Sequence, residues 1–320
     1  MQRIFVFEYL TAGGQARENA APAATLLPMG VAMRDAMVQD LLLAGGLQVS
    51  VACDALAPPP PAGAQACSPP ANMPASAWVA HQAARHDAVW LVAPETDGLL
   101  AQFQQAVPAW QWLGCDANAI ALTGRKRATL ARLAAFGVKT PLVFSATATR
   151  WVVKPDDGAG AVATNRYDSL AAAHAAQCQA AVGRLTLEAW VEGEALSLSL
   201  LCSQDSTELL SINRQHIRVG SQGEVAYQGV SIGAVALDDS RGPLLAAVAT
   251  RVGQAIPGLR GFVGIDLVWH PTLGPVVIEV NPRVTCAYVG LSARLGRNLA
   301  ADMLGHPRAA RRQDAQHAPA

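Results

Sequence analysis

Two carboxylates and one carboxamide near the C-terminal end of the chain have the types and spacing of a metal site. Glu279 and Asn281 are two residues apart, so in a strand both face one side, while Ile278 and Val280 face a core. Asp266 lies 13 residues before Glu279, a gap that allows a strand, a turn and a returning antiparallel strand. Hard oxygen ligands suit Mg²⁺ that also holds water and phosphate, so the pattern predicts a magnesium and triphosphate site.

Short patterns of this kind also have ordinary explanations. An acidic residue at a strand end followed by an Asn-Pro turn is common, although Asp266 upstream and Arg283 just downstream favour the metal site. The small-residue loop 156–161 contains Gly158 and Gly160, and its backbone N–H groups could approach phosphate. A plain turn is the alternative for this loop, which matches neither a P-loop nor a dinucleotide fingerprint.

The composition indicates a well-packed globular protein of more than one unit. The chain has 320 residues, 51% of them hydrophobic, and chains beyond roughly 250–300 residues tend to divide. With 24 basic and 24 acidic residues and no long run of either sign, nothing in the composition supports an extended nucleic-acid surface, and small-molecule partners are expected. The apolar stretches are interrupted by charges, Gly or Pro, and the N-terminus begins directly with a strand, so a cytoplasmic enzyme is expected. The six cysteines are scattered without a Cys-x-x-Cys pair, which predicts reduced thiols.

Residues 1–122 alternate predicted strands with predicted helices, which indicates a parallel sheet covered by helices. Ligands of such sheets bind at the carboxyl ends of strands, so Glu8, Tyr9 and Glu95 are candidate substrate residues. The segment 57–74 is rich in Pro, Ala and Gly and is predicted to be a loop that joins no sheet or helix. The predicted strands are 3–7, 48–53 and 88–93, and the predicted helices are 29–44, 75–85 and 96–107.

The remainder of the chain changes its pattern near residue 123. The stretch 196–281 alternates apolar strands with Gly turns and contains one predicted helix at 243–256, and residues from Gly305 on are predicted to form a frayed tail. Upstream of this stretch, the spacing of apolar residues predicts helix 126–136, strand 151–154, helix 167–183 and strand 185–190.

The order of the chemistry-bearing residues between about 120 and 300 closely resembles the ATP-grasp superfamily. The resemblance implies an α/β fold, α+β in its C-terminal half, in which a parallel-sheet pre-ATP-grasp domain precedes the ATP-grasp fold. It divides the chain into an N-terminal domain (1–122), a small subdomain (123–187), a C-terminal subdomain with the metal site (188–304) and a flexible tail (305–320). The residues that carry it are Lys126, Lys154, Asp157-Gly158-Ala159-Gly160, Glu188-Ala-Trp-Val-Glu-Gly-Glu194, Asp266, Glu279, Asn281 and Arg283.

The resemblance implies ATP and Mg²⁺ as cofactors, with Mn²⁺ as an acceptable substitute. Asp266, Glu279 and Asn281 would hold the metal. In this family, backbone groups of a hinge read the adenine edge and a downstream glutamate binds the ribose. The nucleotide ligands implied for this chain are Lys126, Lys154, Gly158, Gly160, Glu188, Trp190, Val191 and Glu194.

Arg283 would stabilise the transferring phosphoryl group or hold the substrate carboxylate, and Arg214 would share this catalytic work. The alternatives are an exposed cross-strand position for Arg214 and a solvated side chain for the strand-end Lys154. Two departures from the family pattern concern the phosphate contacts. Arg125 precedes Lys126 where an acidic residue is common, and alanine replaces glycine at 161 and 163, which predicts a stiffer loop.

The resemblance implies a carboxylate–amine ligase that releases ADP and phosphate through an acyl phosphate. Phe7-Glu8-Tyr9, Ala93-Pro94-Glu95 and Asn281-Pro282-Arg283 look like the ligases of one-carbon cofactor biosynthesis, among them the tyramine–glutamate ligases of methanofuran synthesis. A counterpart in methylofuran synthesis that joins glutamate to tyramine, tyrosine or a related amine would fit. A nucleotide-binding regulatory protein without turnover and a small-molecule kinase remain alternatives. Both substrates would be small molecules, no nucleic acid or membrane partner is expected, and a homodimer is compatible with the sequence.

Overall fold

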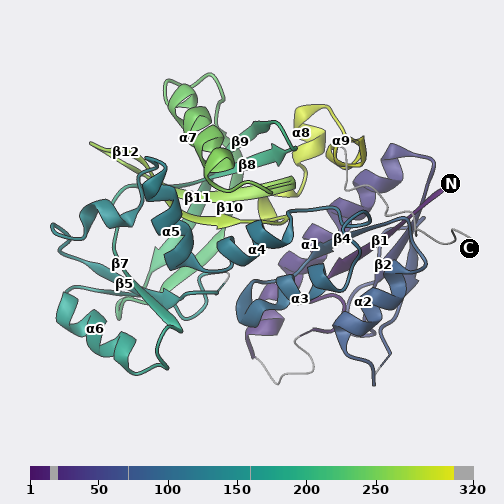
Figure 1. The fold of residues 1–320 in the computed structure, drawn as a ribbon, viewed down its shortest axis with the longest axis horizontal. Coiled ribbons are helices and arrows are strands. Elements are labelled where there is room, and N and C mark those ends of the chain that lie inside the picture. Colours follow the sequence, from purple (N-terminus) through teal and green to yellow (C-terminus); the bar gives the residue numbers. More distant parts are fainter. Residues whose placement is uncertain (15–20, 71, 159, 306–320) are drawn as a thin grey trace, which may run out of the picture.

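The computed structural model describes residues 1–14, 21–70, 72–158 and 160–305. These residues form three sheets. In Figure 1 the N-terminal unit lies on the right, the small sheet lies at the lower left and the large sheet lies above it.

The N-terminal unit is a parallel sheet with the strand order β3-β2-β1-β4. Its elements are β1 (Gln2–Glu8), α1 (Ala21–Ala44), β2 (Leu47–Ala52), β3 (Gln65–Cys67), α2 (Ala75–Ala83), β4 (Ala88–Val92) and α3 (Leu99–Gln105). β1 is buried on both faces because its apolar run is unbroken. Ile4 and Val6 pack with α1 residues, whereas Phe5 and Phe7 pack with residues of α2 and α3 on the other face.

The prediction that segment 57–74 joins no sheet is wrong. Gln65–Cys67 forms the edge strand β3, which pairs in parallel with β2. Three residues are too few to show an alternating pattern, and the surrounding prolines hid this strand from sequence reasoning. The segment is also tied to α1, because the fully buried Arg34 donates to the carbonyl oxygens of Pro58 and Pro59 at 2.8 and 3.2 Å.

Two predicted helices of the N-terminal unit have different limits. α1 begins at Ala21 and not at residue 29, and it contains Pro28, a residue type that more often starts a helix than continues one. The predicted helix 96–107 is broken, because the 3-10 turn η1 (Thr96–Gly98), which precedes α3, contains Asp97 with φ 51° and Gly98 with φ 71°. The loop after β4 therefore stands apart from the helix that follows it.

The small sheet is antiparallel with the order β6-β5-β7 and is covered by α6. The elements of this part are α4 (Ala117–Thr123), α5 (Lys126–Ala135), η2 (Pro141–Phe144), β5 (Trp151–Pro155), β6 (Asn165–Tyr167), α6 (Leu170–Cys178) and β7 (Leu185–Ala189). The helix predicted at 167–183 is shorter, because Tyr167 belongs to β6 and Ser169 caps α6 by accepting from Ala172 N at 3.2 Å. β7 spans the predicted boundary between residues 187 and 188.

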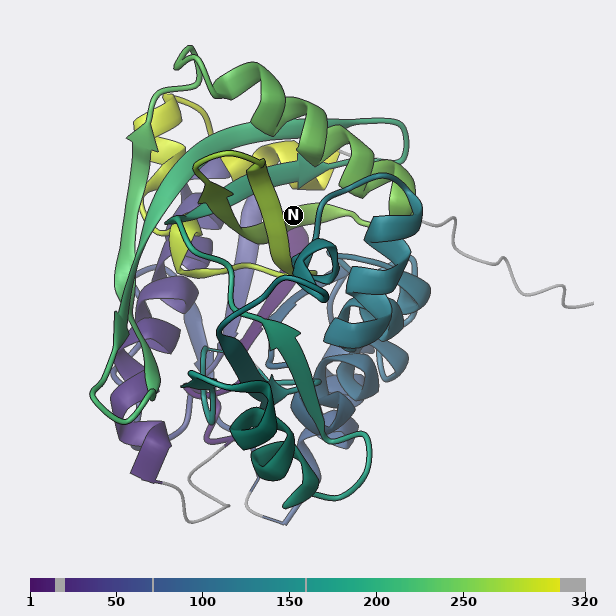
Figure 2. The same cartoon turned by 90° about the vertical axis from the view of Figure 1, so that its left-hand side faces the viewer.

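The large sheet is antiparallel with the order β10-β9-β8-β11-β12. Its elements are β8 (Glu194–Cys202), β9 (Thr207–Val219), β10 (Val225–Val235), α7 (Gly242–Ala255), β11 (Gly261–His270) and β12 (Gly274–Asn281). Leu245 and Val252 of α7 pack in one core with Leu196, Leu198 and Ile265 of the sheet. α7 therefore covers one face of this sheet, as Figure 2 shows, and leaves the other face toward the small sheet.

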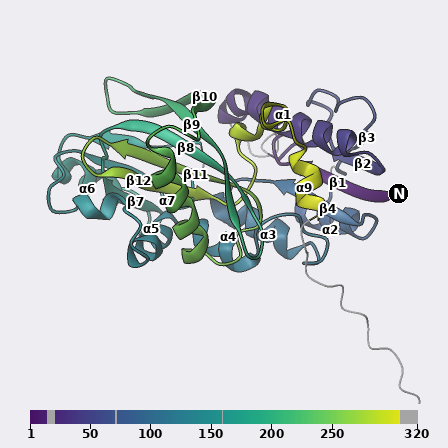
Figure 3. The same ribbon diagram turned by 90° about the horizontal axis from the view of Figure 1, so that it is seen from above.

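The chain ends by returning to the N-terminal unit through η3 (Cys286–Tyr288), α8 (Leu291–Leu295) and α9 (Leu299–Gly305). α9 lies beside α1, as Figure 3 shows. The hydroxyls of Tyr288 and Ser292 both donate to Asp40 Oδ2 of α1 at 2.5 Å. Gly305 belongs to α9 and not to the predicted tail, the rest of which lies outside the described residues.

A parallel sheet followed by antiparallel sheets confirms the predicted α/β class with an α+β C-terminal half. None of the helices in the described part of the chain combines the length and the apolar character that crossing a membrane would require.

Candidate active site

The predicted hairpin forms and brings the three predicted metal ligands together. β11 and β12 pair in antiparallel, with Asp266 opposite Glu279. The pairing shifts at this point, so that Leu267 lies opposite Val277 and Ile278 becomes the extra residue of a bulge. Ile278 is therefore only partly buried, and Val277 and Val280 occupy the core, which corrects the predicted core position of Ile278.

The surroundings of Asp266 fit a divalent cation. Its carboxylate accepts from Gln215 Nε2 at 2.9 Å and from Asn281 Nδ2 at 3.2 Å, both neutral amides. Burial, and secondly the neighbouring charge of Glu279, raise the pKa of Asp266 to about 7. Two carboxylates that repel each other in a buried place favour a cation between them.

This donor set suits Mg²⁺ only together with other ligands. Among the residues that the structure describes, no group of three or more His, Cys, Asp or Glu side chains is arranged for a metal. Asp266, Glu279 and the amide oxygen of Asn281 would therefore share a metal with water and phosphate, the arrangement that Mg²⁺ commonly adopts at nucleotides.

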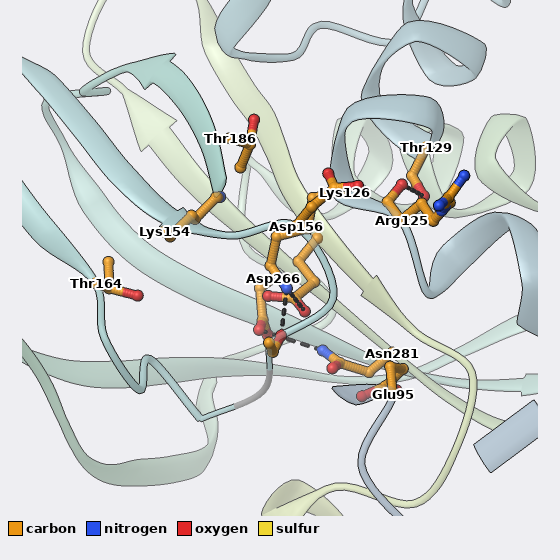
Figure 4. Close-up of polar contacts among 12 residues, drawn as sticks. Glu95, Arg125, Lys126, Thr129, Lys154, Asp156, Thr164, Thr186, Asp266 and Asn281 are labelled. Carbon is orange, nitrogen blue, oxygen red and sulfur yellow. Dashed lines mark hydrogen bonds and ion pairs between the residues drawn. The ribbon is translucent and has the colours of Figure 1, made fainter. Parts of the chain in front are cut away.

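Lys126 meets this set from the first turn of α5. Its Nζ lies 2.8 Å from Glu279 Oε1 and also donates to the carbonyl oxygen of Gly158 in the small-residue loop. Burial lowers the pKa of Lys126, but Glu279 together with Glu95 and Glu188 raises it above its ordinary value. Lys126 therefore stays charged at the centre of the group drawn in Figure 4.

Lys154 is buried and paired, which excludes the solvated position of the alternative interpretation. Its Nζ on β5 lies 2.9 Å from Glu188 Oε2 on the neighbouring strand β7, and the two side chains are 7% and 4% exposed. Thr186 also donates to Glu188, at 3.4 Å. The Lys154 ammonium is thus held in place by the small sheet.

Arg283 pairs with a residue of the N-terminal unit. Its Nε and Nη2 donate to the two oxygens of Glu95 at 3.0 and 2.9 Å, a bidentate contact between residues 188 positions apart. Glu95 lies in the loop after β4, so the carboxyl edge of the N-terminal sheet faces the end of the β11–β12 hairpin. The sequence predicts a catalytic role for Arg283 and a substrate role for Glu95, and it does not predict that the two residues pair.

Each cation of the site thus has one carboxylate partner. Lys126 pairs with Glu279, Lys154 with Glu188, and Arg283 with Glu95. The remaining carboxylate, Asp266, is held by amides, and it lies close enough to Lys126 and Arg283 for both to lower its pKa.

The predicted ribose and adenine residues lie where the chain crosses from the small sheet to the large one. Glu194 at the start of β8 accepts from Arg214 at 2.7 Å and from Arg241 at 2.8 Å. Burial raises the pKa of Glu194, but these two arginines outweigh that effect and hold it below its ordinary value. Arg214 therefore lies with the ribose candidate and is half-exposed.

The crossing itself is residues 190–193, between β7 and β8. Trp190 N donates to the Arg150 carbonyl at 2.9 Å, the Arg166 guanidinium lies 5.8 Å from the Trp190 ring centroid, and Val191 is buried. Gly193 has φ 145°, and a Cβ there would overlap the carbonyl oxygen of Trp269. Only glycine fits this crossing.

In and just after the small-residue loop, three residues have the positive φ that favours glycine, but only one of them is a glycine. Gly160 has φ 67°, Ala161 has φ 59° and Ala163 has φ 52°. A Cβ at Gly158 would lie 2.8 Å from Pro155 Cβ. The two alanines that replace family glycines are therefore in the left-handed region, which alanine adopts at a cost.

Glu8 and Tyr9 take different directions at the end of β1. The buried Glu8 carboxylate accepts from the backbone of Leu10 and Thr11, and burial raises its pKa despite these bonds. Tyr9 donates to the Gly14 carbonyl at 3.3 Å and lines a cavity of about 230 Å³. The cavity is walled by Phe7, Tyr9, Ala12, Gly13, Gly14, Pro69, Pro74, Ala75, Ser76, Leu99, Gln102 and Phe103.

Sequence reasoning missed the polar residues that support Asp266. Gln215 of β9 holds Asp266 directly, and Asn213 donates to Ser197 and Ser199 at 3.3 and 3.1 Å. Ser197 lies on β8, where it is paired with Asp266 of β11 on one side and with Asn213 of β9 on the other. All three side chains therefore share one face of the sheet. The strict alternation of leucine and serine in residues 196–200 was the available signal, because its serines mark the polar face.

Comparison with known proteins agrees with this geometry. A family model described as an ATP-grasp domain matches residues 123–287, and one described as a pre ATP-grasp 3 domain matches residues 47–120. No curated protein matches the sequence.

Solved structures resemble the whole chain at low sequence identity. A protein from Archaeoglobus fulgidus assigned to the ATP-grasp superfamily is 22% identical, with a TM-score of 0.70 over 97% of this chain and 90% of that one. The L-amino acid ligase of Bacillus licheniformis is 18% identical, with a TM-score of 0.64 over 95% and 73%. The D-alanine–D-alanine ligase of Bacillus anthracis is 12% identical, with a TM-score of 0.62 over 95% and 96%.

At these identities the structural likeness shows the fold alone. The family model, however, covers more than half of the chain and includes the paired lysines and the hairpin of Asp266 and Glu279. The chain therefore belongs to the ATP-grasp family, with a pre-ATP-grasp domain before it.

Proposed function

We propose that this protein is an ATP-dependent carboxylate–amine ligase that forms an amide bond and releases ADP and phosphate. The observation that carries the proposal is the meeting of three largely buried cations, Lys126, Lys154 and Arg283, near the Asp266 hairpin. Lys126 contacts Glu279 and is influenced electrostatically by Glu95 and Glu188, the partners of Arg283 and Lys154, so the three ion pairs lie near one another.

The residues divide the work of holding ATP. Lys126 and Lys154 bind the phosphates as buried point charges, and the backbone of the loop with Gly158 and Gly160 covers them. The crossing segment 190–193 and the neighbouring Glu188 receive the adenine, and Glu194 receives the ribose. Mg²⁺, when bound at the hairpin, supplies charge neutralisation on the transferring phosphoryl group.

The chemistry is a pair of displacements. A carboxylate oxygen of the acid substrate attacks the γ-phosphorus, the bond to the bridging oxygen of ADP breaks, and an acyl phosphate forms. The amine nitrogen then bonds to the acyl carbon, the carbon–oxygen bond breaks, and phosphate leaves while the amine loses a proton. Positioned cations serve both steps, because negative charge moves onto oxygen each time. Arg283 lies at the hairpin for this task.

For the substrates we propose glutamate and an aromatic amine such as tyramine or tyrosine, in one-carbon cofactor biosynthesis of the methylofuran type. The support is the cavity of about 230 Å³ at the carboxyl edge of the N-terminal sheet, walled by the rings of Phe7, Tyr9 and Phe103. Pockets for whole ligands are usually about 300–1,000 Å³, so this cavity suits one ring. Leu99, in its wall, is the first residue of α3 and follows Glu95 by four positions.

The test incubates the purified protein with ATP, Mg²⁺, L-glutamate and either tyramine or tyrosine, and measures ADP and product mass. We expect an adduct one glutamyl unit heavier than the amine, with one ADP per adduct. A phosphorylated product without amide would indicate a kinase. Absence of ADP with a complete amino-acid and amine panel would reject turnover and leave a nucleotide-binding regulator.

A further inference from the structure

Lys126 has a contact that a phosphate-binding lysine does not need. Its ammonium lies 2.8 Å from Glu279 and also donates to the Gly158 carbonyl, and its side chain is 6% exposed. These contacts satisfy the lysine without any nucleotide. They also occupy Glu279, the carboxylate that would bridge protein and metal.

The two roles of Glu279 exclude each other electrostatically. A divalent cation on Glu279 would share that carboxylate with the Lys126 ammonium, which lies 2.8 Å from Glu279 Oε1, and two positive charges beside one carboxylate repel each other strongly in a buried site. The phosphates of a nucleotide offer Lys126 another partner, which frees Glu279. Asp266 gives no such obstacle, because its own partners are the amides of Gln215 and Asn281.

We propose that Lys126 is an internal counter-cation that holds Glu279 until a nucleotide arrives, so that the divalent cation and the nucleotide bind synergistically. The inference rests on the metal and nucleotide roles in the proposed function, and it assigns Lys126 a second task as a positioning residue. Because coupling between two ligands is reciprocal, the nucleotide raises the affinity for the divalent cation by the same factor as the cation raises the affinity for the nucleotide.

The test measures Mn²⁺ binding to the free protein by electron paramagnetic resonance, without nucleotide or substrate. Lys126→Met and Lys126→Gln should each bind Mn²⁺ at least about tenfold more tightly than wild type, since both remove a positive charge beside Glu279. Lys154→Met is the matched control, because it removes a buried ammonium that pairs with Glu188 and not with Glu279. The Mn²⁺ affinity of this variant should differ from that of wild type by less than about threefold. Adding Glu279→Gln to Lys126→Gln should abolish the gain.

The reciprocal measurement is ATP binding in the presence of EDTA, where Glu279→Gln should bind more tightly than wild type. The proposal is overturned if neither Lys126 variant gains Mn²⁺ affinity, or if Lys154→Met gains as much. Circular dichroism verifies the fold of each variant, and Lys126→Gln decides if Lys126→Met does not fold. If the Lys126 variants bind Mn²⁺ more tightly but the wild-type protein shows no ligase turnover, only the proposed reaction is rejected. If the wild-type protein turns over but the Lys126 variants do not bind Mn²⁺ more tightly, only this inference is rejected.

Discussion

Glu95 and Arg283 are 5% and 12% exposed and depend on each other for charge compensation. Removal of one partner from a buried pair leaves the other charge uncompensated, whereas replacement of both by apolar residues is often nearly neutral. The contribution of each residue to the free energy of unfolding therefore depends on whether its partner is present, and a double substitution measures this dependence.

We expect Glu95→Ala to lower the free energy of unfolding by about 3 kcal/mol, because Arg283 is then buried without a partner. Glu95→Ala combined with Arg283→Met should recover at least about half of this loss. Urea unfolding measures both. Asp87→Asn is the control, since Asp87 pairs with Arg3 in an exposed position and its loss should cost less than about 1 kcal/mol. Equal losses for the single and the double variant would refute the pairing argument.

Ala163 has φ 52°, in the left-handed region, where the Cβ of alanine raises the conformational energy of the folded state. Ala163→Gly should raise the free energy of unfolding by about 0.5 kcal/mol, because relief of the left-handed strain exceeds the entropy that glycine adds to the unfolded chain. Ala172→Gly in the exposed face of α6 should instead lower it by about 1 kcal/mol. Thermal unfolding of the two variants gives the signs, and a loss at both positions would show that the loop is not strained.

At the scale of elements, the passage from β7 to β8 is fixed by one residue. Gly193 has φ 145° and leaves no room for a Cβ beside the Trp269 carbonyl. The crossing between the small and large sheets therefore depends on the backbone conformation of Gly193.

We expect Gly193→Ala to lower the free energy of unfolding by about 3 kcal/mol and to weaken ATP binding, because the crossing must shift next to Glu194. Gly45→Ala is the matched control: Gly45 also has a positive φ, 72°, but faces open space, so only the backbone cost of about 1 kcal/mol applies. Chemical denaturation and titration with ATP measure the two effects. A Gly193 variant no worse than the Gly45 variant would contradict the contact with Trp269.

Elements whose partners are close in sequence could be predicted, and those with distant partners could not. The hairpin of β11 and β12 was predicted because its strands are joined by a short turn, although the bulge at Ile278 leaves no sequence signal. β3 was missed because it has three residues and pairs with a strand that precedes a proline-rich segment. The pairing of Glu95 with Arg283 spans 188 residues, and no local pattern could reveal it.

At the scale of the molecule, the last helices join the ATP-grasp part to the N-terminal unit. Tyr288 and Ser292 donate to the same oxygen of Asp40, and Asn298 donates to the Asp40 carbonyl at 2.7 Å. Tyr288 also packs edge-on against Trp90 of β4 and Phe262 of β11. One aromatic ring thus contacts both sheets.

We expect Tyr288→Phe to lower the free energy of unfolding by about 2 kcal/mol, since a buried hydrogen bond to a carboxylate is lost while the ring contacts remain. Asp40→Asn should cost no more than this, because the amide oxygen still accepts from one hydroxyl. His216→Ala, which removes an exposed contact with Ser231, is the control and should stay within about 0.5 kcal/mol. Urea unfolding at pH 7 distinguishes them, and an unchanged Tyr288→Phe would show that Asp40 is satisfied otherwise.

The pairing of Glu95 with Arg283 limits how this architecture can be recombined during evolution. A gene fusion that supplied a different N-terminal unit would leave Arg283 buried without its carboxylate unless the newcomer carried an acidic residue at the same place. Exchange of the whole N-terminal unit is therefore restricted to donors that preserve this charge or to chains in which Arg283 changes at the same time, whereas point changes elsewhere in the unit are free of the restriction.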